Sequence, residues 1–227
     1  MEKHINDVFK YPPRNEKFPL PRSLSPHRAF LFEKKQNLNV LEIGCGEAKN
    51  REYFNSIGHL YTGLDIKGDA ADVIADMHQL PFENESFDAI ITIATLQYTT
   101  TPSKVLSESW RVLKRGGTIT GSVAFLEPWT WRGKAQLTPS GIFELLSEQF
   151  FNVEYIWASW NVFDALEAAF NRKNKEKNKR IIDALKKANE AFSDLVIDNS
   201  QLLWEFAGAL NFHAVKSKKS EINLIKL

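Results

Sequence analysis

The sequence predicts an α/β fold with a parallel sheet that is covered by helices on both faces. Two observations carry this prediction. Short apolar segments alternate with segments of helical periodicity from Leu38 to about Phe125. The strand-like segments are apolar throughout, as in D-A-I-I-T-I at Asp88–Ile93, which is typical of strands buried on both faces of a parallel sheet.

The expected elements follow one another along a single domain of residues 38–227. Residues 1–37 are rich in proline and predict an irregular arm with short helices. The expected strands are 38–43, 60–65, 73–75, 88–93, 118–125, 153–158 and 211–216. The expected helices are 47–57, 102–113 and 138–149, with a further helical insertion at about 160–210 between the sixth and seventh strands. The last strand, N-F-H-A-V-K, alternates in a way that predicts one exposed face.

Length and composition are those of one ordinary soluble globular domain. The 227 residues are 43% hydrophobic and 25% charged, and the net charge of +1 provides no field to attract nucleic acid or an anionic membrane. The single cysteine, Cys45, excludes an internal disulfide. No signal peptide, transmembrane segment or metal-ligand spacing of histidines is visible, so a cytoplasmic protein without a metal is expected.

A glycine turn follows the first expected strand in V-L-E-I-G-C-G-E-A. Gly44 and Gly46 allow the backbone to approach a ligand closely. Lys49 stands where a dinucleotide-binding turn has its third glycine, which disfavours a pyrophosphate site. Glu42 also disfavours pyrophosphate, and it could hold an ammonium group directly or through water.

Two further carboxylates end the next strands. Asp65 could accept hydrogen bonds from both hydroxyls of a ribose. Asp76 could accept a hydrogen bond from an adenine amino group, with Met77 as an apolar wall, although Asp69 or Asp72 would serve if the register shifted. Together with Glu42 these acids describe a ligand with an amine, a ribose and an adenine but no phosphate.

The chain resembles the class I S-adenosylmethionine-dependent methyltransferases of the small-molecule, type 11 or UbiE-like, group. The resemblance is carried in order by V-L-E-I-G-C-G-E-A, G-L-D-I, A-D-M-H-Q-L-P-F, S-F-D-A-I-I-T and S-W-R-V-L-K-R-G-G-T. It implies a Rossmann-like seven-stranded sheet of order 3-2-1-4-5-7-6 with an antiparallel last strand. It also implies S-adenosylmethionine as the methyl donor and S-adenosylhomocysteine as the product. The cofactor contacts it implies are Glu42, Gly44, Cys45, Gly46, Asp65, Ile66, Asp76, Met77, Ala94 and Tyr98. Two positions depart from the family pattern, since Ala48 replaces a glycine and Tyr98 stands where many relatives carry a histidine.

The acceptor of the methyl group is expected to be a small molecule with an apolar or aromatic body. Its reacting atom is expected to be oxygen, with nitrogen or carbon as alternatives. The loop after the fifth strand suggests Trp129, Trp131 and Arg132 as substrate contacts, and the candidate catalytic residues are Tyr98, Glu127 and His27.

Two alternatives remain open at this point. The basic segment N-R-K-N-K-E-K-N-K-R at 171–180 could contact RNA and make the protein an RNA methyltransferase, although it could equally be the solvated face of a helix. A catalytically silent family member could instead serve as a partner subunit. No feature of the sequence specifies an oligomeric state.

Overall fold

The structure is a computed structural model, and it contains one seven-stranded sheet with helices on both faces. It describes residues 7–13, 26–33, 36–126, 132–198 and 201–217. The strands are β1 (Asn39–Ile43), β2 (Leu60–Asp65), β3 (Val73–Ile74), β4 (Phe87–Ile93), β5 (Leu113–Ala124), β6 (Phe151–Asn161) and β7 (Ala207–Lys216). The helices are α1 (Pro26–Glu33), α2 (Arg51–Ser56), the short 3-10 helix η2 (Leu96–Tyr98), α3 (Pro102–Val112), α4 (Pro139–Glu148), α5 (Val162–Asn174), α6 (Lys179–Asp198) and α7 (Leu202–Glu205).

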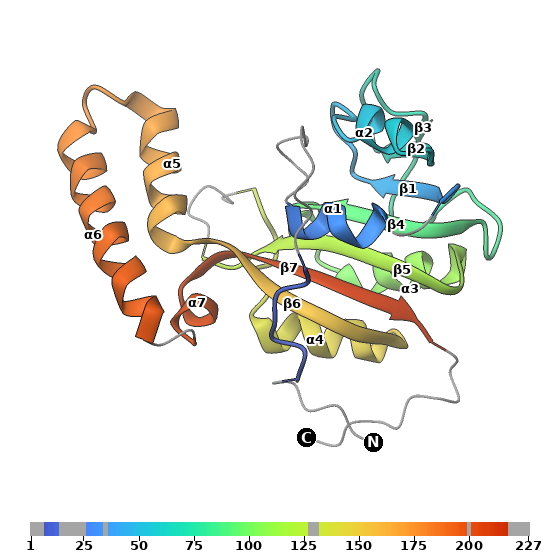
Figure 1. The fold of residues 1–227 in the computed structure, drawn as a ribbon. Helices are drawn as coiled ribbons and strands as arrows, with labels where there is room; N and C mark the ends of the chain where they lie inside the picture. Colours follow the sequence, from blue (N-terminus) through green and yellow to red (C-terminus); the bar gives the residue numbers. More distant parts are fainter. Residues whose placement is uncertain (1–6, 14–25, 34–35, 127–131, 199–200, 218–227) are drawn as a thin grey trace.

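The strand order is β3-β2-β1-β4-β5-β7-β6, which confirms the expected Rossmann-like sheet (Figure 1). Neighbouring strands are parallel except at β7, which is antiparallel to both β5 and β6. The six parallel strands therefore all end at the same side of the sheet, called here the carboxyl edge. Open α/β sheets bind their ligands outside this edge.

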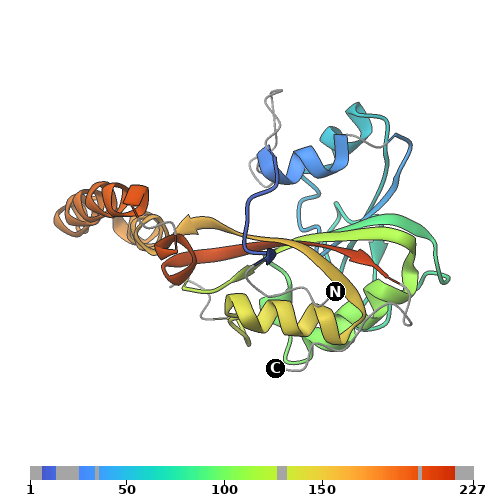
Figure 2. The ribbon, with the colours of Figure 1, turned by 60° about the horizontal axis from the view of Figure 1, so that its bottom comes forward.

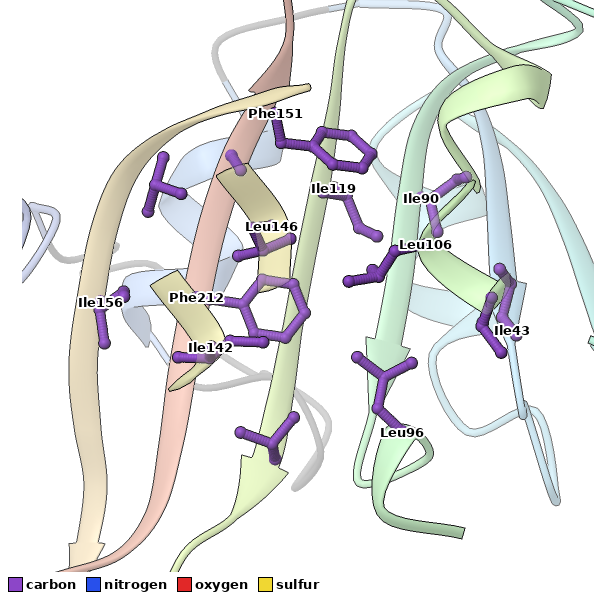
Figure 3. Packing of buried hydrophobic residues seen from close by; sticks show 14 of the residues in the cluster. Ile43, Ile90, Leu96, Leu106, Ile119, Ile142, Leu146, Phe151, Ile156 and Phe212 are labelled. Carbon is purple, nitrogen blue, oxygen red and sulfur yellow. The ribbon is translucent and has the colours of Figure 1, made fainter. Parts of the chain in front are cut away.

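The two faces of the sheet carry separate apolar clusters. On one face α3 and α4 supply side chains such as Leu106 and Ile142, which pack with Phe212 of β7 (Figure 3). α1 and α2 lie on the other face (Figure 2). They supply Phe32 and Phe54, whose ring centroids are 5.0 Å apart in an edge-to-face arrangement. Each fully buried side chain of this size contributes roughly 1.5–3 kcal/mol, so the helices hold the strand ends in fixed positions.

Part of the expected N-terminal arm belongs to the folded body. Val8 is fully buried, and its carbonyl accepts a hydrogen bond of 2.7 Å from the N–H of Ile156 in β6. The N–H of Lys10 donates to the carbonyl of Ile156 at 3.1 Å. These two bonds place residues 8–10 along the outer strand of the sheet.

The helical insertion between β6 and β7 is confirmed, and it consists of α5, α6 and α7. Figure 1 shows α5 and α6 as a hairpin that projects from the carboxyl edge, away from the sheet. The hairpin is fixed at its base by polar contacts. Asn161 caps α5 and donates to Asn189 of α6 at 2.7 Å, and Asn189 donates to Asp164 at 2.7 Å.

The structure corrects the sequence predictions at β5 and β7. β7 begins at Ala207 rather than at Asn211, and both of its faces are buried, so the expected exposed face was wrong. The reason is its place in the sheet, because β7 lies between β5 and β6 instead of at an edge. β5 begins at Leu113, directly after α3, and not at residue 118 as expected.

Candidate active site

The glycine turn after β1 lies at the carboxyl edge and is tied to β2. The N–H groups of Gly44 and Cys45 both donate to the carbonyl of Leu64, at 2.8 and 3.1 Å. Gly44 has a φ of 75°, and a Cβ atom there would overlap the side chain of Thr95 in the turn after β4. Gly46 has a φ of 54°, and a Cβ atom there would meet no atom within 4 Å. The turn therefore requires glycine at one position and is open to a ligand at the other.

Ala48 has a φ of 50°, in the left-handed region that favours glycine. Its N–H donates to the carbonyl of Cys45 at 2.8 Å, which closes the turn. Helix α2 consequently begins at Arg51 and not at Glu47 as the sequence suggested, because residues 47–50 form turns. The small side chain of alanine is thus accommodated in a turn whose conformation favours glycine.

Glu42 lies inside the fold and not on an open surface. It is 4% exposed, and its carboxylate accepts hydrogen bonds from Asn50 Nδ2 at 2.8 Å and from the Tyr61 hydroxyl at 2.6 Å. Burial raises the pKa of Glu42 to about 7, and the hydrogen bonds and the buried charge of Arg28 in α1 partly oppose this rise. A carboxylate that changes charge near neutral pH is therefore built in behind the glycine turn.

Cys45, between the two glycines, is a buried thiol. Burial raises the pKa of Cys45 to about 11, and the negative charges of Glu42 and Asp65 add to this. The thiol therefore stays protonated near neutral pH, which suits a small packing residue and not a nucleophile.

Asp65 joins the end of β2 to the glycine turn. One carboxylate oxygen accepts from the N–H of Gly46 at 2.9 Å, and the other accepts from the N–H of Ile66 at 2.7 Å. Each oxygen retains a second lone pair for a ligand hydroxyl. The side chain of Ile66 beside it is an exposed apolar group, with 68% of its surface accessible. A polar and an apolar contact for a nucleoside thus stand side by side at the carboxyl edge.

Asp76 directly follows β3, where the sequence placed it. It accepts hydrogen bonds from the backbone N–H of His78 at 2.8 Å and from the ring Nδ1 at 2.5 Å, and these bonds lower the pKa of Asp76. His78 Nε2 lies 2.6 Å from Thr99 Oγ1, so the loop after β3 is connected to the loop after η2. Asp72, the alternative acid, is occupied by Arg51 at 2.7 Å, and Met77 is half-buried next to Asp76.

The turn after β4 completes this edge. Ala94 is exposed with a φ of 52°, and its N–H donates to the carbonyl of Ser122 in β5 at 3.1 Å. Tyr98 has 47% of its surface exposed, whereas its neighbour Gln97 is 2% exposed. The backbone carbonyl of Gln97 accepts a hydrogen bond of 2.6 Å from the backbone N–H of Lys134, which connects the turn to the segment that precedes α4.

Several expected site residues cannot be placed. Glu127, Trp129 and Trp131 lie outside the described residues, and so does the side chain of His27, whose backbone is in α1. Arg132 is the first described residue after that gap, and it is exposed. The structure therefore brings together the expected cofactor residues, while the expected acceptor residues stay predictions.

Several buried polar groups were missed by the sequence reasoning. Among the residues that the structure describes, the side chains of Thr92, Gln97 and Asn211 each have buried polar atoms without a hydrogen-bond partner. Near Asn211 on β7, His213 Nδ1 lies 2.6 Å from Thr120 Oγ1. The alternation of N-F-H-A-V-K was the available signal, but it was assigned to a solvent-facing side.

The carboxyl edge thus presents carboxylates, an open glycine turn and exposed apolar side chains. Asp65 and Asp76 favour hydroxyl and amino groups over phosphate, because carboxylates repel anions. Within the described part of the chain, no group of three or more His, Cys, Asp or Glu residues could hold a metal ion. None of the described helices is long and apolar enough to cross a membrane.

Comparison with known proteins agrees with this geometry. Residues 41–120 match a family model that is described as a methyltransferase domain. The chain is 32% identical over 113 residues to the sterol 4-C-methyltransferase strm-1 of Caenorhabditis elegans, covering 42% of this chain and 34% of that protein. It is 27% identical over 150 residues to a fatty-acid O-methyltransferase of Mycolicibacterium smegmatis, covering 59% and 54%. The chain thus spans about a third to about half of the length of these relatives.

The fold has solved relatives as well. Phosphoethanolamine N-methyltransferase 2 of Haemonchus contortus, in complex with S-adenosyl-L-methionine, superimposes with a TM-score of 0.54 and 18% identity. The match covers 81% of this chain and 50% of that protein. At this level of identity the likeness concerns the fold.

Proposed function

We propose that this chain is a class I S-adenosylmethionine-dependent methyltransferase and that it transfers a methyl group to an oxygen atom of a small molecule with an apolar or aromatic body. The observation that carries the proposal is the set of groups at the carboxyl edge. The open glycine turn at Gly46 stands next to the Asp65 carboxylate, and Gly44 of the same turn lies against Thr95 in the turn that carries the exposed Ala94 and Tyr98.

The residues present fit S-adenosylmethionine. The backbone at Gly46 has free space, Asp65 has lone pairs for ribose hydroxyls, and Ile66 offers an apolar surface for the base. Asp76 would accept from the adenine amino group. The buried charge of Glu42 would favour the ammonium group of the amino acid part, and it would act across the glycine turn instead of by open contact.

When bound, the cofactor supplies an electrophilic methyl group on a sulfonium. The chain's own residues bind it, orient the acceptor and exclude water, because in-line placement of two reactants accounts for much of such catalysis. Tyr98 has 47% of its surface exposed at this edge, and its hydroxyl would hydrogen-bond the acceptor. Glu127 and His27 stay candidates for receiving the acceptor's proton.

The acceptor class is inferred from aromatic residues. Trp129 and Trp131 follow β5 in the sequence, and Trp160, the next-to-last residue of β6, has 36% of its surface exposed. Aromatic faces favour flat or apolar molecules. The relatives that act on a sterol and on the oxygen of a fatty acid support the same class of acceptor. Arg132 would bind a polar end of such a molecule.

The basic segment at 171–180 supports RNA as a second candidate acceptor. It lies where α5 passes into α6, and its described side chains are largely exposed. A further relative is an 18S rRNA (guanine-N(7))-methyltransferase from Bos taurus, at 33% identity over 101 residues. The small-molecule acceptor is preferred because the basic residues sit on the projecting hairpin and not among the groups of the carboxyl edge (Figure 1).

Transfer of label from tritiated methyl-S-adenosylmethionine tests the proposal. The protein is incubated with an extract of small metabolites and, separately, with total RNA at about 50 and 200 mM salt. We expect label in small, organic-soluble molecules and none in RNA. Label in RNA alone would replace the proposal with the second candidate. Binding of the cofactor without any transfer would identify a silent partner subunit.

A further inference from the structure

A polar residue on β7 lies at the carboxyl-edge half of the sheet without a partner. Asn211 is 1% exposed, and neither its Nδ2 nor its Oδ1 has a hydrogen-bond partner within the described chain. A buried amide without partners is unfavourable, because folding removes its hydrogen bonds to water and replaces none of them. Such a group is explained when a ligand supplies the missing bonds.

The register of the sheet shows what surrounds Asn211. It is paired with Ser122 of β5 on one side and Trp157 of β6 on the other. Ser122 is paired with Ile93 at the end of β4, and its side-chain and backbone oxygens both accept from the N–H of Ala94 at 3.1 Å. Strands lie about 4.8 Å apart, so Asn211 is only two strands from the turn that carries Ala94.

The neighbouring side chains on this face are small or aromatic. Ala124 of β5 is paired with Ala209 of β7, one pleat closer to the carboxyl edge than Ser122 and Asn211. Trp157 is 1% exposed and supplies an apolar wall. The alanines next to the amide contribute little bulk, and the tryptophan favours an apolar or aromatic body.

We propose that Asn211 is a specificity-determining residue that binds the methyl acceptor through a neutral group able to both donate and accept hydrogen bonds, such as a hydroxyl or a carboxamide. The inference rests on the proposed function. The amide offers a carbonyl oxygen and two N–H donors, and it carries no charge. An acceptor with a carboxylate or phosphate would call for an arginine in the site, and one with an ammonium group would call for a carboxylate. A neutral amide suits a neutral group of the acceptor.

Asn211→Leu tests the assignment, with Thr92→Val as the matched control. Thr92 is also buried with an unpartnered side-chain atom, but it lies on the opposite face of the sheet from Asn211. It is paired with Gly121, which is paired in turn with Phe212 of the cluster under α3 and α4. Both substitutions remove an unsatisfied polar group, so both variants are expected to melt higher, by on the order of 2–6 °C. Asn211→Val serves as a second variant in case leucine does not pack.

The acceptor labelled by the wild-type protein in the metabolite extract is the probe. We expect the Asn211 variants to lose roughly 10- to 100-fold in kcat/KM for that acceptor, mostly through KM, with an unchanged Kd for S-adenosylmethionine. Thr92→Val is expected to keep wild-type kcat/KM. If the wild-type protein transfers the methyl group and the folded Asn211 variants keep its kcat/KM, the inference about Asn211 is wrong while the proposed function stands. No transfer by the wild-type protein would overturn the proposed function and this inference with it.

Discussion

The buried carboxylate of Glu42 predicts a pH-dependent loss of stability that Glu42→Gln removes. The pKa of Glu42 is about 7 in the fold against an ordinary 4.5, so the folded protein holds this proton to a higher pH than the unfolded chain does. Stability from this group is therefore present at low pH and lost as pH rises from 4.5 to 7. At 1.36 kcal/mol per pH unit the loss is about 3 kcal/mol.

Urea unfolding of the wild-type protein and Glu42→Gln at pH 5 and pH 8 measures this effect. Glutamine has the same shape, its oxygen can accept from Asn50 and its NH2 group can donate to the Tyr61 hydroxyl, so the charge is removed while the volume is kept. We expect the free energy of unfolding of the variant, relative to that of the wild type, to rise by about 2.5 kcal/mol from pH 5 to pH 8. The same substitution should weaken S-adenosylmethionine binding at pH 8 by about 10-fold, because the buried charge behind the glycine turn is gone.

The control is Glu47→Gln, in the same loop. The Glu47 side chain is 79% exposed and paired with Lys49, so this variant should unfold at the same urea concentration as the wild type at both pH values. If Glu42→Gln gave the same stability difference from the wild type at pH 5 and pH 8, the buried ionisation assigned to Glu42 would be wrong.

Three further predictions concern the site and its supports. Gly44→Ala should lower the free energy of unfolding by about 2–4 kcal/mol and weaken S-adenosylmethionine binding at least 10-fold, since the new methyl group overlaps Thr95. Gly58→Ala is the control, because Gly58 has a φ of 82° and open space around its Cβ position. This variant should lose only about 1 kcal/mol of stability and bind normally in calorimetry. Tyr98→Phe should lower kcat about 10-fold with an unchanged cofactor Kd, and an unaltered kcat would remove its hydroxyl from the mechanism. Arg111→Ala should cost about 2–3 kcal/mol in urea unfolding with normal cofactor binding, because Arg111 donates to the carbonyls at positions 80 and 82, at 2.9 and 2.7 Å; a loss under about 0.5 kcal/mol would contradict this.

Local patterns were sufficient to predict the strands that carry the cofactor residues. The second strand was expected at Leu60–Asp65 and is found there, since a short, largely apolar run that ends at an acid is a local signal. The order of the sheet came from the family resemblance. The turn at Gly44 and Gly46 was visible because positive φ values favour glycine.

Features that depend on residues far apart in the sequence were missed. The segment A-G-A-L at 207–210 consists largely of helix-forming residues, and only its place between β5 and β6 makes it a strand. The burial of Glu42 requires Tyr61 and Arg28 to meet it from other elements, which no spacing in the sequence indicates. The unpartnered state of Asn211 likewise appears only when three strands are in register.

Titration calorimetry with S-adenosylmethionine on the wild-type protein, Asp65→Ala and Asp69→Ala tests the central claim most directly. Asp65 accepts from the glycine turn and is proposed to hold the ribose, whereas Asp69 is an exposed acid nearby. We expect one bound cofactor per chain, a loss of about 30- to 100-fold in affinity for Asp65→Ala, and wild-type affinity for Asp69→Ala. Absent binding to the wild-type protein, or equal affinity in all three, would contradict the assignment of this edge as the methyl-donor site.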